Sequence, residues 1–422
     1  MHIAILLLFA GGIVYLVLTR QTQSPHAASQ PASDTGGETG WKRMAFISKG
    51  KLFYRSPQGQ LEQIHSPYIQ DVIDRTDKRK QLHGWKEDTS LGQSFTGNKQ
   101  RLDADRLELQ VASAQFIGEE KVLYFLQDQS FGGLFEYDIE SGQERRLLHR
   151  QNLRFDDMNF DAGTGQICCA QYFDNGIANI VIMDREGDAY REVTAGDTED
   201  SSPCWVTGQA HHILYQSAGL ARSEEGYLIA RGPSSIEMLD LESGEVSNVL
   251  QDSQYDYLQP RVHPGGDLYF IRRPYEKEKY DSSSLLLDTL LFPFRLLRAL
   301  FHYLNFFSLM YSRKPLTTAS GPKVEADLKD ILVKGKRVDA QKALQKESAV
   351  HGVPSLVPGN WQLIRRSPQG EETALAGNVA SFGISEEGRV LYSNGYAVFA
   401  LNEGASANIV LKEKLIADVI VS

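Results

Sequence analysis

The sequence predicts an all-β protein: a six-bladed β-propeller with an N-terminal membrane anchor helix and a mostly helical hydrophobic insertion in one blade. After Trp41, most of the chain consists of short alternating strands separated by Gly-containing turns. Three aromatic residues that open successive units lie 44 and 45 residues apart, the length of a four-stranded blade: Phe116, Phe160 and Trp205. Two long apolar stretches fall outside this pattern, at 3–18 and 285–311.

Composition limits the class of protein and its partners. The 422 residues are 41% hydrophobic and 23% charged, which is typical of a globular protein. A net charge of −10 argues against a nucleic-acid partner. Residues 260–350 nevertheless carry 16 Lys and Arg against 10 Asp and Glu, and such a basic island can face a membrane or a partner. The chain has three cysteines, Cys168, Cys169 and Cys204. An odd number of cysteines, two of them adjacent, suits buried, reduced thiols better than disulfides.

The N-terminus predicts an anchor followed by a linker. As a helix, the apolar residues 3–18 would rise about 24 Å, close to the hydrocarbon thickness of a bilayer. An uncleaved anchor within 1–20 is favoured over a signal peptide, because a basic n-region and a clean cleavage site are missing. The side of the membrane is unresolved, and Arg20 favours the cytoplasmic face for the body. Residues 21–40 are rich in Ser, Gly, Pro, Gln and Thr and predict a flexible linker.

The propeller is predicted in two parts, 41–275 and 358–422, which together hold six units. Each unit reads as an inner hairpin followed by an outer hairpin. Four of the outer turns place a glycine where a tight hairpin needs a positive φ: Gly142, Gly187, Gly244 and Gly370.

One repeat carries a family resemblance. Thr194–Tyr215, TAGDTEDSSPCWVTGQAHHILY, resembles the repeat of TolB-like six-bladed propellers, in which a polar loop precedes Ser-Pro-x-Trp, a turn and an apolar strand. Tyr257–Ile271, YLQPRVHPGGDLYFI, is a second, partial match. The resemblance covers 41–275 and 358–422. It implies the propeller fold and a binding role, and it implies no activity, because function depends on a site.

The first interruption of the repeat is residues 66–110. Apolar residues lie there at helical spacing and predict a short amphipathic helix: Ile69, Val72, Ile73 and Thr76. We expect this helix to cap the propeller or to pack on its rim.

The second interruption, 276–357, divides the inner from the outer hairpin of one blade. Within 285–311 the few polar residues share one side of a helix, so the remaining faces need cover from water. Three arrangements remain open: a helix in the lipid headgroup region, a helix docked on protein, and a membrane span. The predicted membrane-contacting residues are Leu290, Leu291, Phe292, Phe294, Leu297, Phe301, Phe306 and Phe307, and the predicted basic rim is Arg295, Arg298, Arg313 and Lys314. For 324–344, a helix and a hairpin around Gly335 both fit.

Searches for catalytic and metal motifs favour a binding protein. The sequence contains no G-x-S-x-G, Walker loop, H-E-x-x-H or C-x-x-C motif. Asp157, Asn159 and Asp161 have the spacing of calcium ligands, but Ala162 and Cys168 replace the required Gly and Glu, which favours a strand and a turn. We therefore expect no catalytic residue, metal or cofactor.

The predicted function is that of a non-catalytic, membrane-tethered propeller that binds or scaffolds a protein partner, with membrane lipid as a second partner. Propellers bind partners on their loop-rich faces, and the candidate partner loops contain Asp197, Glu199, Asp200, Tyr255 and Tyr257. One alternative is an enzyme with a site in the channel mouth, which needs at least two inward-facing titratable groups from different blades. Another is an accessory subunit of an envelope or membrane complex.

Overall fold

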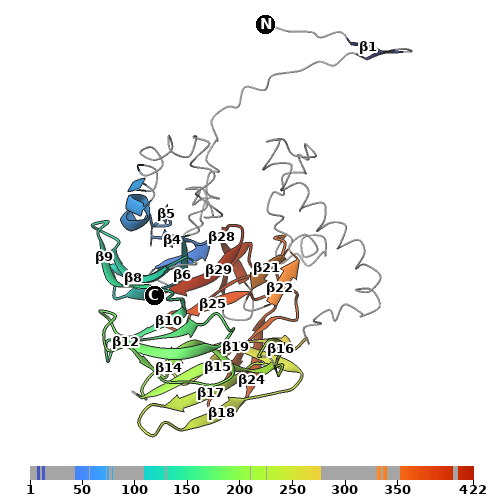
Figure 1. Ribbon diagram of the computed structural model, residues 1–422. Coiled ribbons are helices and arrows are strands. Elements are labelled where there is room, and N and C mark those ends of the chain that lie inside the picture. Colours follow the sequence, from blue (N-terminus) through green and yellow to red (C-terminus); the bar gives the residue numbers. More distant parts are fainter. Residues whose placement is uncertain are drawn as a thin grey trace, which may run out of the picture. The chain divides into compact units, whose positions relative to one another are not determined.

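The computed structural model describes residues 7–9, 12–14, 43–56, 58–72, 74–75, 78, 109–128, 131–209, 211–224, 226–276, 330–333, 336–339, 352–402 and 407–422 (Figure 1). The chain forms two separate units, Met1–Thr39 and Gly40–Ser422. The described residues of the second unit are almost entirely β-structure and include one short helix.

The first unit does not support the expected anchor helix. Its described residues form strands β1 (Leu7–Phe9) and β2 (Gly12–Val14), which pair antiparallel. Gly11 and Gly12 lower the helix propensity of this stretch and favour a turn, and β-branched neighbours suit a strand. Within the described part of the chain, no helix has both the length and the apolar character that crossing a bilayer requires.

The second unit begins with two four-stranded antiparallel sheets. The first contains β29 (Ile416–Val421), β3 (Met44–Ser48), β4 (Lys51–Arg55) and β5 (Leu61–Gln63). The second contains β6 (Gln110–Ile117), β7 (Lys121–Gln127), β8 (Phe131–Asp138) and β9 (Glu144–Gln151).

A nine-stranded sheet follows. Its first half contains β10 (Phe155–Asp161), β11 (Gln166–Tyr172), β12 (Ala178–Asp184) and β13 (Arg191–Glu192). Its second half contains β14 (Thr198–Trp205), β15 (His212–Arg222), β16 (Leu228–Arg231), β17 (Ser235–Asp240) and β18 (Val246–Leu250). A single parallel bridge, Ala178 to Glu199, joins the two halves, so each half is an antiparallel meander of its own.

Two further four-stranded sheets complete the unit. One contains β19 (Tyr255–Val262), β20 (Leu268–Pro274), β23 (Gln362–Arg366) and β24 (Glu372–Ala376). The other contains β25 (Ser381–Ile384), β26 (Val390–Ser393), β27 (Ala397–Leu401) and β28 (Ala407–Lys412).

The first strands of these meanders surround a common channel. Strand β10 contacts β6 and β14, β14 contacts β19, and β29 contacts both β25 and β6. The remaining junction is made by a hydrogen bond, in which Gln259 Nε2 of β19 donates to the carbonyl of Phe382 in β25 over 3.2 Å. This radial arrangement around innermost strands is that of a propeller.

The last strand closes the ring. Strand β29 pairs antiparallel with β3, with Ile416 opposite Ser48 and Val421 opposite Met44. The first sheet is therefore completed by residues from the other end of the unit, and hydrogen bonds hold the ring shut without a covalent link.

Three innermost strands carry the same β-bulge. Asp157, Ser202 and Gln259 have φ of 52°, 50° and 52°, and the ladder to the second strand is interrupted at each of them. Proline follows at Pro203 and Pro260, where the ladder needs no amide hydrogen. Each bulge shifts by one residue the alternation of side chains between the two faces of the strand, so the side chains after it point to the other face.

The four glycine turns expected from the sequence are confirmed. Gly142, Gly187, Gly244 and Gly370 have φ of 68°, 82°, 72° and 91° and lie between the third and fourth strands of their meanders. A residue with a Cβ would be strained in this region.

The first insertion begins with the predicted helix, at residues 67–72 and 74–75. Ser66 caps it, since its Oγ accepts a hydrogen bond from the backbone N–H of Ile69 at 3.3 Å. The ring of Tyr68 lies 5.2 Å from that of Phe135 in β8, and Ile69 packs against the same buried cluster. The helix thus packs on the rim of the second sheet.

The second insertion leaves β20 and returns at β23, which are paired neighbours. The chain between β20 and β23 therefore connects the second and third strands of one meander. Strands β21 (Asp330–Val333) and β22 (Lys336–Asp339) form an antiparallel hairpin, which settles the alternative around Gly335 in favour of the hairpin. The predicted membrane-contacting residues Leu290, Leu291, Phe292, Phe294, Leu297, Phe301, Phe306 and Phe307, and the basic rim Arg295, Arg298, Arg313 and Lys314, lie outside the described residues.

Candidate functional site

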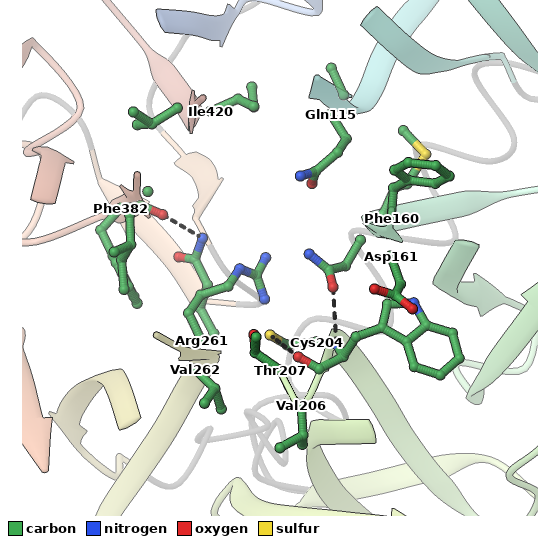
Figure 2. Close-up of a pocket in the computed structure, with 18 of the residues that line it drawn as sticks. Gln115, Phe160, Asp161, Cys204, Val206, Thr207, Arg261, Val262, Phe382 and Ile420 are labelled. Atoms are coloured by element: carbon green, nitrogen blue, oxygen red, sulfur yellow. Dashed lines mark hydrogen bonds between the residues drawn. The ribbon is translucent and has the colours of Figure 1, made fainter. Parts of the chain in front are cut away.

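A cavity of about 560 Å³ lies in the channel, and residues from all the innermost strands line it (Figure 2). It reaches the end of the channel where the first strands turn into the second strands, because Thr164, Thr207 and Gln209 of those turns belong to its lining. A second cavity of about 510 Å³ shares several of its residues, Gln115, Phe160, Ile384 and Val421. We call the first cavity, with these turns, the channel mouth.

The side chains around the channel mouth come from equivalent positions of the repeat. Gln115, Asn159 and Cys204 each directly precede one of the evenly spaced aromatic residues, and Arg261 follows the bulge of β19. In Figure 2, Gln115 and Arg261 point toward the open centre from opposite sides, and Phe382 and Ile420 lie at the left of the view. Equivalent positions of the repeat therefore supply several of the polar lining residues.

Arg261 carries a positive charge that no described carboxylate neutralises. Its Nη1 donates to the carbonyl oxygen of Pro260 at 2.8 Å and to those of Ser202 and Pro203 at 3.4 Å. These bonds hold the guanidinium in place at the wall of the cavity, beside the Cys204 thiol. Among the ion pairs of the described residues, none includes Arg261.

The three cysteines are buried and unpaired, and one of them lines the channel mouth. Burial raises the pKa of the Cys204 thiol, and the nearby Arg261 guanidinium opposes this effect only in part. Burial also raises the pKa values of Cys168 and Cys169. A neutral, shielded thiol is a poor nucleophile.

Two buried polar atoms of the channel mouth have no hydrogen-bond partner within the described protein. They are Trp205 Nε1, a donor, and Gln259 Oε1, an acceptor, in side chains of residues that are 8% and 1% exposed. Unsatisfied buried polar atoms are rare in folded proteins, and a ligand or water usually completes them. The channel mouth can therefore offer one donor and one acceptor besides Arg261.

The carboxylates of the channel mouth already serve the protein's own structure. Asp161 accepts hydrogen bonds from the backbone N–H groups of Gly163 and Thr164 and from Thr164 Oγ1, at 3.2, 3.1 and 2.7 Å. Asp418 accepts from Gln259 Nε2 at 3.4 Å.

The calcium-like spacing of β10 is a strand and a turn, as expected from the sequence. Asp157 Oδ2 accepts from Ser202, Asn159 Oδ1 accepts from the Trp205 N–H at 2.9 Å, and Asp161 stabilises its own turn. Within the described ranges, no cluster of three metal-ligating side chains occurs.

The predicted partner loops lie at the opposite end of the innermost strands. Asp197 and Glu199, at the start of β14, form ion pairs with Arg222 at 2.9 Å and Arg231 at 2.6 Å, both from the β15–β16 hairpin. Asp200 is buried, accepts from Ser217 Oγ at 2.7 Å, and has a pKa raised by burial.

Tyr255 and Tyr257 stand at the start of β19. Arg272 lies 5.5 Å from the centre of the Tyr255 ring, and Tyr257 packs edge-on against Phe270. The structure thus gathers both loops at one end of the channel and gives most of their side chains partners within the chain. A role in partner binding stays a prediction.

Sequence reasoning missed the polar lining of the channel mouth: Gln115, Asn159, Gln259 and Arg261. The residue directly before each spaced aromatic could have indicated this lining. In the Ser-Pro-x-Trp motif this residue is the x, which here is Cys204.

The sequence matches no protein-family model and no curated protein. Among solved structures, the chain is similar to TolB from Acinetobacter baumannii, with 11% identity and a TM-score of 0.49 over 91% of this chain and 67% of that chain. It is similar to the tricorn protease, with 11% identity and a TM-score of 0.44 over 90% of this chain and 34% of that chain. A nidogen/laminin complex gives 8% identity and a TM-score of 0.45 over 90% and 97%. Two TolB structures are thus among the solved structures to which the chain is similar, as the resemblance of the repeat predicts.

Proposed function

We propose that this chain is a six-bladed propeller that binds a segment of a protein partner in the channel mouth and is held at a membrane. The observation that carries the proposal is the cavity to which all the innermost strands contribute. It is lined by the Arg261 cation and by two residues with a buried polar atom that has no hydrogen-bond partner in the described protein. The blade count follows from treating the two halves of the nine-stranded sheet as separate blades.

Binding fits the channel mouth better than catalysis does. Asp161, Cys204 and Asp418 line one cavity from three strands, which is the observation that favours an enzyme as the second candidate. However, Asp161 is engaged by three hydrogen bonds of its turn, and the raised pKa of Cys204 keeps its thiol neutral. Neither group is prepared to act as a base or a nucleophile.

A membrane contact is supported at the end of the propeller opposite the channel mouth. The second insertion leaves there after β20, and Tyr275, the residue directly before it, donates a hydrogen bond of 2.5 Å from its Oη to the carbonyl of Arg231 in the β15–β16 hairpin. The same hairpin exposes Tyr227 and Ile229, at 75% and 49%. Exposed apolar residues beside the start of a long apolar insertion suit an interfacial contact.

Photo-crosslinking in cells tests the binding site. A photoreactive amino acid at Thr207, exposed in the lining of the channel mouth, should give a protein adduct, and the same probe at Val246 on the outer strand β18 should not. No adduct from Thr207, or equal adducts from both positions, would contradict the proposal.

Fractionation tests the tether. Removal of residues 1–20 should leave part of the protein with membranes, and removal of both 1–20 and 276–357 should release it. Full release after removal of 1–20 alone would contradict a contact through the second insertion.

A further inference from the structure

The wall of the channel mouth has a polar and an apolar part. The half-buried polar side chains Gln115, Asn159 and Arg261 come from β6, β10 and β19. The apolar part is formed by β25 and β29, where Ile384 and Val421 are half-buried and Phe382 and Ile420 lie behind them. A ligand that fills this cavity must combine a polar group with an apolar one.

The charge of Arg261 selects the polar group. A guanidinium presents its donors in a planar fork that matches a carboxylate, and its Nη1 is already committed to three backbone carbonyls. The remaining edge, Nε and Nη2, can bind both oxygens of one carboxylate. A doubly charged phosphate fits less well, because Asp161 and Asp418 line the same cavity and would repel the second charge.

The two buried atoms without a hydrogen-bond partner limit further which chemical groups the ligand must contain. Gln259 Oε1 requires a donor, and a carboxylate cannot provide one. Trp205 Nε1 requires an acceptor, such as a carboxylate or carbonyl oxygen. The terminal residue of a polypeptide contains an amide N–H, a carboxylate and a side chain within a few bonds of one another.

Resting on the proposed binding role of the channel mouth, we propose that it recognises the free C-terminus of a polypeptide that ends in an apolar residue. Arg261 binds the terminal carboxylate, Gln259 Oε1 accepts the N–H of the last residue, and the β25–β29 wall receives its side chain. The cavity volume, about 560 Å³, leaves room for the last residues of a chain.

Three small probes separate these requirements, with the full chain titrated by calorimetry. N-acetyl-L-leucine has all three groups, N-acetyl-L-leucinamide lacks the charge, and 4-methylpentanoate lacks the N–H. The first should bind about tenfold or more tightly than the second, because charge-assisted bonds to arginine are the strongest in such sites. It should also bind more tightly than the third.

Variants assign the carboxylate to Arg261. R261Q should weaken the binding of N-acetyl-L-leucine about tenfold or more. R261K keeps the charge without the planar fork, so its affinity should lie between those of the wild type and R261Q. R191Q removes the same charge from an exposed position of β13 and should leave the affinity for N-acetyl-L-leucine unchanged. Q115E, across the cavity from Arg261, provides a second variant should R261Q not fold, and it should weaken binding by placing a negative charge beside the ligand.

Each outcome decides a separate point. Equal binding of the acid and the amide, or full binding by R261Q, overturns recognition of a carboxylate. Equal binding of N-acetyl-L-leucine and 4-methylpentanoate overturns the polypeptide terminus in favour of a small apolar acid. Adducts from Thr207 together with equal binding of acid and amide would leave the proposed function standing and remove this inference alone.

Discussion

Arg273 and Asp256 form a buried ion pair in the second unit, with Nε 2.8 Å from Oδ2 and both side chains only 4% exposed. Asp256 Oδ1 also accepts from the backbone N–H of Ser234 at 2.9 Å, and the Arg273 guanidinium lies 4.6 Å from the centre of the Trp361 ring. These contacts join β19 and β20 to the segment that returns from the second insertion. They fix both ends of that insertion to the propeller.

The first prediction concerns this pair. D256N should lower the free energy of unfolding by about 3–5 kcal/mol, because it leaves the Arg273 charge buried without its partner. Denaturant unfolding measures the change. The exposed pair Arg145–Glu186, with side chains 53% and 52% exposed, is the matched control, and E186Q should cost less than about 1 kcal/mol. Equal effects of the two variants would contradict the prediction.

The second prediction is a pH dependence at Asp200. Burial raises the pKa of this carboxyl above its usual value, so its contribution to stability is present at low pH and is lost as the pH rises through the folded-state pKa. D200N keeps an acceptor for Ser217 and should stabilise the protein at pH 7 relative to the wild type. The difference should shrink as the pH falls toward 4, which chemical unfolding at several pH values measures.

Asp138, a carboxyl whose pKa is lowered instead of raised, is the control. Hydrogen bonds from Ser141 lower the pKa of Asp138, so D138N should destabilise the protein at pH 7 and lose its effect at low pH. The same sign for both variants would show that the local environments do not act as described.

The third prediction concerns the close approach of β25 to β29. A Cβ at Gly383 would lie 2.8 Å from Val421 Cγ2 and 2.9 Å from the carbonyl oxygen of Val419. G383A should therefore destabilise the protein by about 1–3 kcal/mol, as overpacking does. A methyl group at Gly219 would meet no described atom within 4 Å, so G219A should be near neutral in the same thermal unfolding assay. Equal losses of stability in the two variants would contradict the prediction.

The fourth prediction concerns the thiols. Burial raises the pKa values of Cys168, Cys169 and Cys204, so none should react with a thiol reagent in the native state at pH 8. All three should react at once in denaturant. Rapid modification of any of them in the folded protein, followed by mass spectrometry, would contradict their burial.

The propeller could be predicted because its signals are local. The spaced aromatics Phe116, Phe160 and Trp205 and glycines such as Gly142 report the repeat within a single blade. The predicted N-terminal anchor helix is not supported by the described residues of that segment. An apolar run fits a strand as well as a helix, and Gly11 and Gly12 interrupt this one.

The channel mouth could not be predicted because its residues meet only in the closed ring. Gln115, Arg261 and Val421 are far apart in sequence. In β19, the left-handed conformation of Gln259 also shifts the alternation, so a simple period of two does not place Arg261. Similarly, the pairing of Asp197 and Glu199 depends on Arg222 and Arg231 from a later hairpin.

The pairing of β29 with β3 determines when, during synthesis, the cavity of the channel mouth can form. Asp418 to Val421 are both the strand that shuts the ring and one wall of the cavity, so a nascent chain that still lacks them has no finished pocket to offer. Ligand capture would then begin only after translation has delivered this final strand. A chain that stops before β29 is therefore expected to lack the finished cavity.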